Sequence, residues 1–452
     1  MTVINCEILK EVVYNLCLQA GQEYSSYPYN KILSAYEKNK SERLAHIIQN
    51  AENADRIQRP LCQDTGTVHV FLEVGNDVSF SANPKEAIND GVKKCYVEKY
   101  FRKSVVENEL ISGKNLETNT PALINTEYVC GNTMKIKVLL KGAGCDNVSE
   151  ISMLSPTTTE DEFVNFAVEK ILEKGKYACP PLFVSIAAGT GAENVMTEAE
   201  KTYFEEKIDM PQLRERIIKE VNKKADKKYE NFYLADLKLT MKPHHMASFP
   251  VAIAFNCHSL RISSAVIEGG IVKYLQNKPN YIKIDAGKNS AKEINVNDKN
   301  ELTKLSEGQE VLLTGKIIIA RDAAHKKMLE YKKHGKKLPF DIKDAVIFYA
   351  APCSAKPDEI VGPIGPTTSN RMDKFLADFP EISATIGKGN RSKEAEKIIR
   401  DNKSVYFETE GGIATLLATC FKSYKVIAFE ELSTEAVCLA EVEKLPAKVV
   451  IK

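Results

Sequence analysis

Cysteine is the residue type whose spacing could indicate metal chemistry, and the sequence holds 11 cysteines in 452 residues. None stands in a CxxC pair, the close spacing that a zinc ribbon or a ferredoxin-type cluster uses. Thiolates bind soft metals, but a free cysteine is also a small hydrophobe that packs well in a core. The spacing alone predicts that most of these cysteines are core residues, and it identifies no metal ligand.

Two cysteines stand in segments that combine turn residues with functional side chains. Residues 59–67 read RPLCQDTGT, which places a thiol, an amide and a carboxylate side by side before a predicted strand. Residues 178–181 read ACPP, in which two prolines fix the backbone after the thiol. Taken alone, the first segment is better explained as a turn in which Asp64 bonds its own backbone. The second is explained equally well as the approach to a strand.

A third segment places two of the seven histidines one strand's length before a cysteine. Residues 244–248 read HHMAS, and residues 256–258 read NCH. No HExxH spacing supports a zinc site. A structural histidine is the first interpretation, and a histidine that acts as acid or base is the second.

Three later segments combine cations with helix starts. They are ARDAAH at 320–325, GPTTSNRM at 365–372 and GKGNRS at 387–392. The first follows a predicted strand, where open α/β sheets place ligands, and the other two could bind an anion through free N–H groups. None fits a Walker or GxGxxG pattern, so a nucleotide is not predicted. Each alone fits a capped helix, but the last two segments together predict a small acidic ligand held by Arg371 and Lys388.

Hydrophobic periodicity indicates the elements that position these segments. Helices are expected at residues 7–21, 41–54, 161–174, 322–334, 371–379 and 393–401, and strands at residues 67–74, 135–140, 182–187, 310–320 and 345–350. Residues 262–275 predict a hairpin that turns at Gly269-Gly270. Beyond residue 304 strands and helices alternate, which is typical of a layered α/β domain.

Composition and charge exclude several functions. Lys and Arg number 62 against 61 Asp and Glu, so no bulk charge favours nucleic acid. The first 21 residues carry Glu7 and Glu11 and lack the pattern of a secretory signal or a transit peptide. No apolar run is long enough to span a bilayer. We therefore expect a cytoplasmic protein without nucleic-acid or membrane partners.

Taken in order, the segments resemble those of class I (iron–sulfur-dependent) fumarate hydratases and the related tartrate dehydratases. The matches are CQDTG at 62–66, FRKSVV at 101–106, NTPA at 119–122, ACPP at 178–181, ARDAAH at 320–325, GPTTSNRM at 365–372 and GKGNRS at 387–392. Single motifs are weak, whereas the ordered set is highly specific. The CHxxR pattern at 257–261 is closer to the two-subunit enzymes, so the chain resembles their α and β parts fused end to end.

The resemblance implies a fold of α/β class with three parts. Residues 1–275 would form an α-subunit-like domain of mixed α+β type that carries the cluster ligands. The polar residues 276–304 would form a linker and domain start, and residues 305–452 a β-subunit-like, layered β/β/α domain of swivelling type.

In such enzymes three cysteines hold a [4Fe–4S] cluster and leave one iron without a protein ligand. Carried onto matching positions, these ligands are Cys62, Cys179 and Cys257, which come from three distant loops. An open iron can act as a Lewis acid on a substrate oxygen, whereas a fully ligated cluster transfers electrons. The resemblance thus implies a hydro-lyase for the reversible hydration of fumarate to L-malate, working as a homodimer.

The resemblance also assigns roles in binding and proton transfer. The residues implied to contact a small dicarboxylate are Gln63, Arg102, Gly144, Arg321, Arg371 and Lys388. Thr367 matches the position proposed as base, with Asp64 and His245 as proton-handling partners. A threonine base needs activation by nearby cations or the substrate, so Asp64 and His245 are the more conventional candidates.

Two glycine loops depart from the family pattern. Residues 142–147 read GAGCDN where a GGGS-E-N-like loop is usual, so Ala143 adds a Cβ and Cys145 replaces a serine. Residues 188–191 read AGTG instead of the usual Gly-Gly-Thr pattern. Fumarate, tartrate and mesaconate therefore stay open as substrates, since one hydroxyl or methyl group is worth only about 1–3 kcal/mol in a pocket.

Two non-enzymatic alternatives are weaker. A non-catalytic iron–sulfur sensor would not need the full set of Arg, Lys, Thr and His groups. A structural zinc protein is disfavoured by the dispersed cysteines.

Overall fold

A computed structural model describes residues 2–108, 110, 113–207, 209–284 and 291–452. The chain divides into two compact units, which are described separately. Unit 1 comprises Met1–Arg59 and Asp64–Lys283, and unit 2 comprises Pro60–Gln63 and Ile284–Lys452. None of the helices in the described part of the chain combines the length and apolar character that a membrane span requires. The architecture mixes helices and sheets, as the α/β prediction states.

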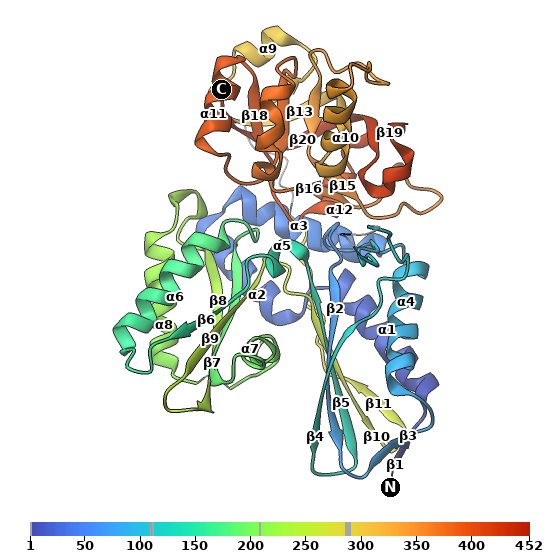
Figure 1. Ribbon diagram of the computed structural model, residues 1–452, viewed down its shortest axis with the longest axis vertical. Helices are drawn as coiled ribbons and strands as arrows, with labels where there is room; N and C mark the ends of the chain where they lie inside the picture. The colour runs from blue at the N-terminus through green and yellow to red at the C-terminus, as the bar shows by residue number, and fades with distance from the viewer. Residues whose placement is uncertain (1, 109, 111–112, 208, 285–290) are drawn as a thin grey trace. The chain divides into compact units, whose positions relative to one another are not determined.

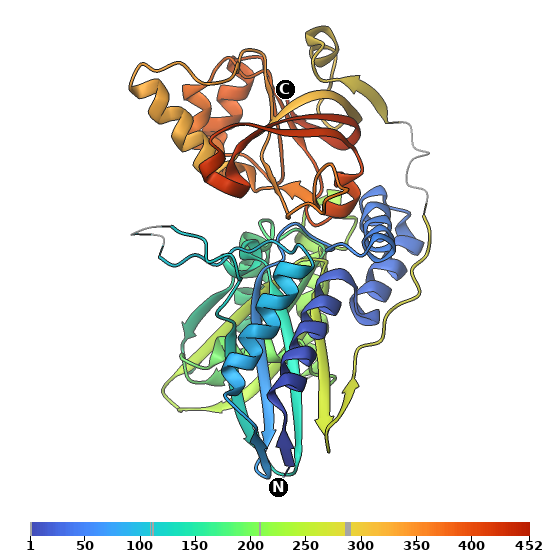
Figure 2. The ribbon, with the colours of Figure 1, turned by 90° about the vertical axis from the view of Figure 1, so that its right-hand side faces the viewer.

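The first sheet of unit 1 has the strand order β11-β10-β5-β2-β4. Its strands are β2 (Thr67–Gly75), β4 (Leu123–Val129), β5 (Thr133–Lys141), β10 (Ile262–Glu268) and β11 (Ile271–Tyr274). Helices α1 (Cys6–Gln22) and α4 (Pro84–Glu98) pack side by side over this sheet (Figure 2). Leu9, Val13 and Leu16 of α1 recur at helical spacing and therefore enter one core with the sheet.

The second sheet of unit 1 has the strand order β6-β9-β7-β8. Its strands are β6 (Glu150–Leu154), β7 (Leu182–Thr190), β8 (Leu234–His244) and β9 (Phe249–Asn256). Side chains of α6 (Glu160–Gly175) and α8 (Pro211–Lys224) share a core with Val184 and Ile186 of β7. Helix α7 (Val195–Thr202) packs against β7 and β9 on the side away from α6 and α8 (Figure 1).

Six further elements complete the described part of unit 1. They are β1 (Thr2–Ile4), α2 (Ser26–Asn39), α3 (Glu42–Ile57), β3 (Val78–Phe80), α5 (Ala143–Asp146) and η1 (Lys227–Tyr229).

Unit 2 is built on a sheet with the strand order β12-β13-β14-β17-β18-β20-β19. Strand β13 also pairs with β20, which closes β13, β14, β17, β18 and β20 into a ring. The strands are β12 (Lys292–Asn295), β13 (Glu310–Ile319), β14 (Val346–Phe348), β17 (Ala384–Gly387), β18 (Val405–Glu408), β19 (Phe421–Ala428) and β20 (Val437–Ile451). A separate pair joins β15 (Ala350–Pro352) to β16 (Ile364–Pro366).

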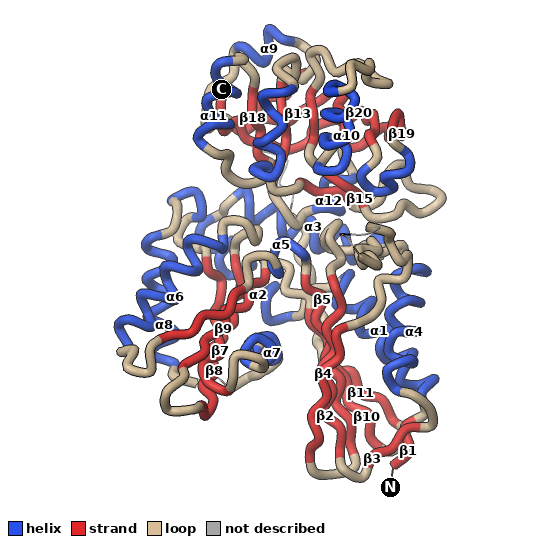
Figure 3. Tube along the Cα trace, viewed as in Figure 1, coloured by secondary structure: helices blue, strands red, loops and turns tan. Residues whose placement is uncertain are grey.

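Helices pack around this sheet. They are α9 (Lys299–Thr303), α10 (Asp322–Lys333), η3 (Ser369–Asp378), α11 (Lys393–Asp401), α12 (Ala414–Ala418) and η4 (Glu430–Glu435). Helix α11 packs against β18 and β20 (Figure 3). The 3₁₀ helix η3 packs against both α10 and α11.

Two sequence expectations need correction in unit 2, and a third is not tested. The helix expected at residues 371–379 is the 3₁₀ helix η3, whose first residue, Ser369, donates its backbone N–H to the Lys388 carbonyl. The strand expected at 345–350 divides at Tyr349, because the Tyr349 carbonyl accepts the Thr367 N–H and the next residues pair with β16. Part of the predicted linker 276–304, residues 285–290, lies outside the described residues, and β12 and α9 form beyond it.

Candidate active site

Three loops of the first sheet lie at one edge, because the strand register brings their ends together. The first residue of β2, Thr67, pairs with the last residue of β5, Lys141. Asp64 therefore lies beside the loop after β5, and its Oδ2 accepts a hydrogen bond from the Ala143 N–H at 2.9 Å. Arg261, which precedes β10, donates from Nη1 to the Asp64 carbonyl at 2.5 Å.

Two of the predicted cluster ligands lie at one end of the second sheet. The last residue of β9, Asn256, pairs with Phe183 at the start of the antiparallel strand β7. Cys257 follows β9 and Cys179 precedes β7, so the antiparallel pairing places both cysteines at the same end. Both pack into one apolar cluster, which also contains Cys145 of α5.

The surroundings of Cys257 favour its thiolate. A hydrogen bond from the Cys145 side chain holds the pKa of the Cys257 thiol well below its usual range, although burial acts in the opposite direction. The positive charges of His258 and Arg261 also lower this pKa. The Ser259 hydroxyl lies 3.1 Å from Sγ of Cys257. The thiolate is the form of cysteine that binds iron, so these contacts suit a cluster ligand.

Cys179 adopts an unusual backbone conformation. Its φ of 58° lies in the left-handed region, which costs a non-glycine residue roughly 1–2 kcal/mol. Glycine would adopt this φ without that cost. The half-buried Cys179 side chain thus occupies a backbone position that glycine would adopt with less strain.

Cys62 and Gln63 belong to unit 2, where both are buried. The Cys62 thiol lies 3.3 Å from the Gln63 side-chain oxygen, and the Cys353 thiol lies 3.3 Å from the Gln63 carbonyl. A Cβ on Gly365 would overlap the Gln63 amide, so this amide lies directly against the Gly365 backbone. The amide predicted to bind substrate is thus packed against the segment that carries Thr367.

Carboxylates hold the two predicted arginines of unit 2. Arg371 donates two hydrogen bonds to Asp322, from Nε at 3.0 Å and from Nη2 at 2.6 Å. Nη2 of Arg321 lies 2.7 Å from Oε1 of Glu435, and its Nε lies 3.5 Å from Asp322. Because one carboxylate contacts both guanidinium groups, Asp322 fixes their orientation relative to each other.

The structure brings Thr367 and Lys388 together through their backbones. The Lys388 N–H donates to the Thr367 carbonyl at 3.3 Å, and Thr368 pairs with Lys388 as an isolated bridge. The Thr367 side chain is 8% exposed, and the Lys388 side chain is half-buried. The two loops predicted to bind an anion are therefore neighbours in unit 2.

The remaining predicted residues, Arg102, Gly144 and His245, belong to unit 1. Arg102 is half-buried and Gly144 lies in α5. His245 is exposed, and its Nδ1 accepts a hydrogen bond from the Ala247 N–H within its own turn at 3.1 Å. Within the described ranges, no hydrogen bond joins His245 to Asp64, so the structure does not bring these two proposed partners together.

The predicted cysteine ligands fit an iron–sulfur cluster rather than a single metal ion. In the part of the chain that is described, no group of three or more His, Cys, Asp or Glu side chains could hold a single metal ion. A [4Fe–4S] cube differs from a single ion, because each thiolate binds a separate iron. Cys179 and Cys257 lie at one sheet end, and the hydrogen bonds and positive charges around Cys257 lower the pKa of its thiol despite its burial, so the two cysteines fit this requirement.

Comparison with known proteins decides the family. A family model described as fumarate hydratase (fumerase) matches residues 10–266, and one described as fumarase C-terminus matches residues 269–452. This chain belongs to the class I fumarate hydratase family. The resemblance predicted from the ordered motifs is confirmed, and the protein is a hydro-lyase.

Individual relatives agree with this family membership. The chain is 31% identical over 441 residues to "Fumarate hydratase class I, anaerobic" of Escherichia coli (strain K12), covering 90% of this chain and 80% of the relative. It is 31% identical over 445 residues to "Fumarate hydratase 1, mitochondrial" of Leishmania major, with 90% and 80% covered. "Putative L(+)-tartrate dehydratase subunit alpha" of Methanocaldococcus jannaschii is 31% identical over 271 residues, covering 55% of this chain and 94% of that protein.

This fumarate hydratase family member contains a buried charge network that its sequence did not predict. Lys141, fully buried at the end of β5, lies 2.6 Å from Glu200 and 3.0 Å from Asp146. His69 lies 2.8 Å from the other oxygen of Glu200. The network ties the loop after β5 to α7 and β2. The only local signal for this network is that Lys141 ends an apolar strand. A lysine in such a position is more often exposed to solvent, so the sequence alone does not predict its burial.

Arg391 is a second buried cation outside the predicted site. It lies within the GKGNRS segment, and its Nε donates to Asp373 at 2.6 Å. Its guanidinium lies over the rings of Tyr349 and Tyr406, at 5.4 and 5.0 Å from their centroids. These contacts fix the loop of Lys388 against η3.

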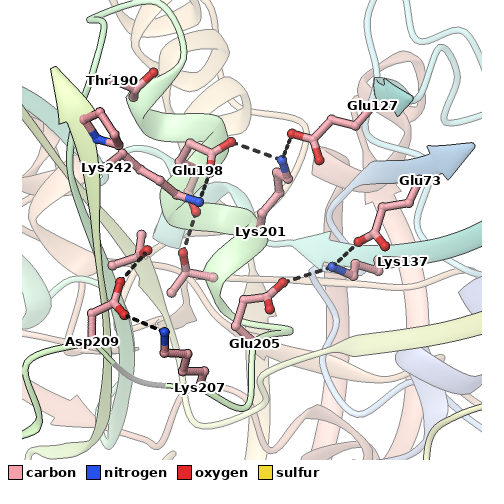
Figure 4. A pocket seen from close by; sticks show the side chains of 13 residues that line it. Glu73, Glu127, Lys137, Thr190, Glu198, Lys201, Glu205, Lys207, Asp209 and Lys242 are labelled. Atoms are coloured by element: carbon pink, nitrogen blue, oxygen red, sulfur yellow. Dashed lines mark hydrogen bonds and ion pairs between the residues drawn. The ribbon is translucent and has the colours of Figure 1, made fainter. Parts of the chain in front are cut away.

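Unit 1 also contains a charged cavity of about 560 Å³ beside α7 (Figure 4). Its lysines and carboxylates pair within the wall: Lys137 lies 2.7 Å from Glu73 and 3.1 Å from Glu205, and Lys242 lies 3.2 Å from Glu198. A wall rich in carboxylates does not suit a dianion. We therefore assign the substrate chemistry to the predicted site residues and not to this cavity.

Proposed function

We propose that this chain catalyses the reversible hydration of fumarate to L-malate with a [4Fe–4S] cluster held by Cys62, Cys179 and Cys257. The observation that carries the proposal is the pair of family matches, which together span residues 10–452 except for two positions. The thiolate-favouring surroundings of Cys257 support its part in holding the cluster. When bound, the cluster supplies an iron that acts as a Lewis acid on a substrate oxygen.

The side chains of the chain would bind and polarise the dicarboxylate. Removing a proton from the carbon next to a carboxylate moves negative charge onto that carboxylate, which cations must stabilise. An arginine offers two parallel hydrogen bonds for this purpose. We assign this binding to Gln63, Arg102, Gly144, Arg321, Arg371 and Lys388.

Proton transfer is assigned to Asp64, Thr367 and His245. The hydrogen bond from the Ala143 N–H to Asp64 supports a fixed carboxylate next to the glycine loop. The backbone hydrogen bond from Lys388 to Thr367 makes the two residues neighbours, and we assign the activation of the threonine hydroxyl to this lysine. His245 is exposed, so a role for it requires that its turn approach the substrate.

Tartrate dehydration is the second candidate, because a putative tartrate dehydratase α subunit matches 55% of this chain. Mesaconate hydration is a third activity of the same chemical type. We also propose a homodimer and a cytoplasmic location.

The deciding experiment compares substrates under anaerobic conditions. The protein is purified without oxygen, and kcat/KM is measured for fumarate, mesaconate and L(+)-tartrate on the same preparation. We expect fumarate to be preferred at least about tenfold, the discrimination that one hydroxyl or methyl group allows. A higher kcat/KM for tartrate or mesaconate would show that the substrate is wrong while the reaction class stands.

A further inference from the structure

The ammonium group of Lys141 joins the glycine loop at residues 142–147 to helix α7. Lys141 is the last residue of β5 and is fully buried. Its Nζ lies 2.6 Å from Oε1 of Glu200, in α7, and 3.0 Å from Oδ1 of Asp146, in α5. Burial lowers the pKa of Lys141, but the two carboxylates and the hydrogen bonds that they accept raise it above its usual value. The lysine therefore stays charged at neutral pH and binds the loop on one side and the helix on the other.

Helix α7 is a fixed anchor for this contact, because it is bonded to the second sheet. The helix packs against β7 and β9. The hydroxyl of Tyr203, which follows α7, donates to the Ala254 carbonyl of β9 at 2.6 Å. The second carboxylate oxygen of Glu200 lies 2.8 Å from Nδ1 of His69 on β2. Glu200 is thus held from two sides and fixes the position of the Lys141 ammonium.

The loop held in this way places a backbone N–H on the carboxylate of Asp64. Ala143 stands two residues after Lys141, and its N–H donates to Oδ2 of Asp64 at 2.9 Å. A Cβ on Gly142 would lie 3.1 Å from the same oxygen, so the carboxylate lies directly against the loop backbone. A shift of the loop by about 1 Å would break the hydrogen bond, because such bonds extend only to about 3.2 Å.

We propose that Lys141 is a positioning residue for proton transfer. Held by Glu200, its ammonium fixes Asp146 and with it the glycine loop, and the loop in turn fixes the orientation of the Asp64 carboxylate. The inference rests on the proposed function, because that function assigns proton transfer to Asp64. The alternative is a purely structural role, in which the buried ion pair matters only for the stability of the fold.

Removing one or both buried charges separates these two roles. Lys141→Met leaves the Glu200 carboxylate buried with one partner fewer, so its midpoint of thermal unfolding should fall. The double variant Lys141→Met with Glu200→Gln removes both charges and should unfold near the wild-type temperature. Its loop still lacks the cation, so its kcat should stay about 10²-fold below wild type, the loss that a misplacement of about 1 Å can cause. A wild-type kcat in the double variant would overturn the inference.

The Michaelis constant should change less than kcat in the double variant. Most of the groups assigned to substrate binding lie outside the loop, so KM should rise less than about tenfold. A rise in KM that accounts for the whole loss of kcat/KM would show a role in substrate binding and overturn the inference. If the double variant fails to fold, a variant of the loop itself decides.

That variant is Asp146→Ala, which cuts the loop side of the contact without touching the core. The Asp146 side chain is 55% exposed, so the fold should keep its stability. We expect kcat to fall about tenfold, because the loss of one charged hydrogen bond frees the loop. Asp161→Ala is the matched control, since its exposed carboxylate pairs with Arg216 at 2.5 Å, and it should equal wild type. An equal kcat in the two variants would overturn the inference.

Hydrogen–deuterium exchange reads the loop itself in the anaerobic holoenzyme. Mass spectrometry of the peptide that covers residues 142–147 reports whether its amides remain hydrogen-bonded. Exchange in this peptide should be at least about tenfold faster in Asp146→Ala and in the double variant than in wild type. The peptide of residues 135–140, within β5, should exchange as in wild type and so show that the sheet is intact. Unchanged exchange in the loop would overturn the inference.

The outcomes separate the two claims. A wild-type chain that is inactive on fumarate, mesaconate and tartrate overturns the proposed function, and the inference falls with it. An active wild type whose kcat and loop exchange are unchanged in Asp146→Ala and in the double variant overturns the inference alone.

Discussion

The carboxylate of Asp64 accepts a hydrogen bond from the backbone N–H of Ala143, with 2.9 Å between Oδ2 and N. Arg261 holds the same residue through its carbonyl, at 2.5 Å. These residues come from three loops that the register of β2, β5 and β10 brings to one edge of the sheet. The register therefore fixes a carboxylate against the glycine loop, and the assignment of Asp64 to proton transfer depends on this contact.

Replacing this carboxylate with an amide should remove proton transfer and preserve the fold. Asp64→Asn keeps the shape of the side chain and an acceptor for the Ala143 N–H, but it cannot take a proton. We expect kcat for fumarate hydration to fall about 10²- to 10⁴-fold with an unchanged iron content. The exposed Asp77→Asn serves as control. A kcat of Asp64→Asn within tenfold of the wild-type value would show that Asp64 does not transfer the proton.

The assignment of the cluster ligands predicts that replacing Cys179 and replacing Cys95, both in unit 1, have different effects on cluster content. Cys179→Ser should lose the cluster, because a serine oxygen is a poor ligand for iron in such a cluster. Cys95→Ser lies in the core of the first sheet and should retain it. Iron and sulfide per chain are measured after anaerobic reconstitution of both variants. Equal iron content in the two would show that the ligand assignment is wrong.

Arg371 should not tolerate lysine if it binds a substrate carboxylate. The Arg371 guanidinium group makes two parallel hydrogen bonds to the Asp322 carboxylate. A lysine ammonium cannot reproduce this two-bond geometry with a carboxylate. We expect Arg371→Lys to lower kcat/KM about 10- to 100-fold, the loss of roughly 1.5–3 kcal/mol for a charged hydrogen bond. Arg216→Lys changes another carboxylate-paired arginine, in α8 at the surface, and should have no effect. Similar kinetics for both variants would refute the role of Arg371.

The buried His325 should make the free energy of unfolding of the protein fall as the pH becomes acidic. Burial lowers the pKa of His325 to about 4, although its hydrogen bond to the Arg321 carbonyl acts in the opposite direction. An unfolded histidine titrates near 6.5, so between about pH 6.5 and 4 the unfolded chain binds more protons than the folded chain. This contribution is fully present above pH 6.5 and is lost as the pH falls, by about 3 kcal/mol in total.

The measurement compares the unfolding free energy of the cluster-free wild type and His325→Gln at pH 7 and pH 5. Wild type should lose about 2 kcal/mol relative to the variant between these pH values, because only wild type gains the proton on unfolding. A difference between the two proteins that is the same at both pH values would contradict the burial of a neutral imidazole.

Elements with local signals could be predicted from the sequence. Helix α1 follows from the helical spacing of its apolar residues, and the β10–β11 hairpin follows from Gly269-Gly270 between two apolar runs. The ordered motifs predicted the family because each is short and contiguous. By contrast, η3 forms where an α-helix was expected, because its first residue, Ser369, donates its backbone N–H to Lys388, 19 residues later.

The contacts within the site could not be predicted, because they depend on strand register between distant segments. Nothing local to Cys145 indicates that it meets Cys257, 112 residues later, since that contact needs both β9 and α5 in place. The burial of Lys141 likewise requires Glu200 from α7 and Asp146 from α5. A lysine without these partners would remain in water.

The most direct test of the central claim measures fumarate hydration as a function of cluster content. Anaerobic preparations reconstituted with increasing iron and sulfide are assayed for kcat per chain, and one sample is then exposed to air and reloaded. We predict activity proportional to cluster content up to about four irons per chain, lost in air and restored on reloading. Full activity in an iron-free, folded protein would contradict the account.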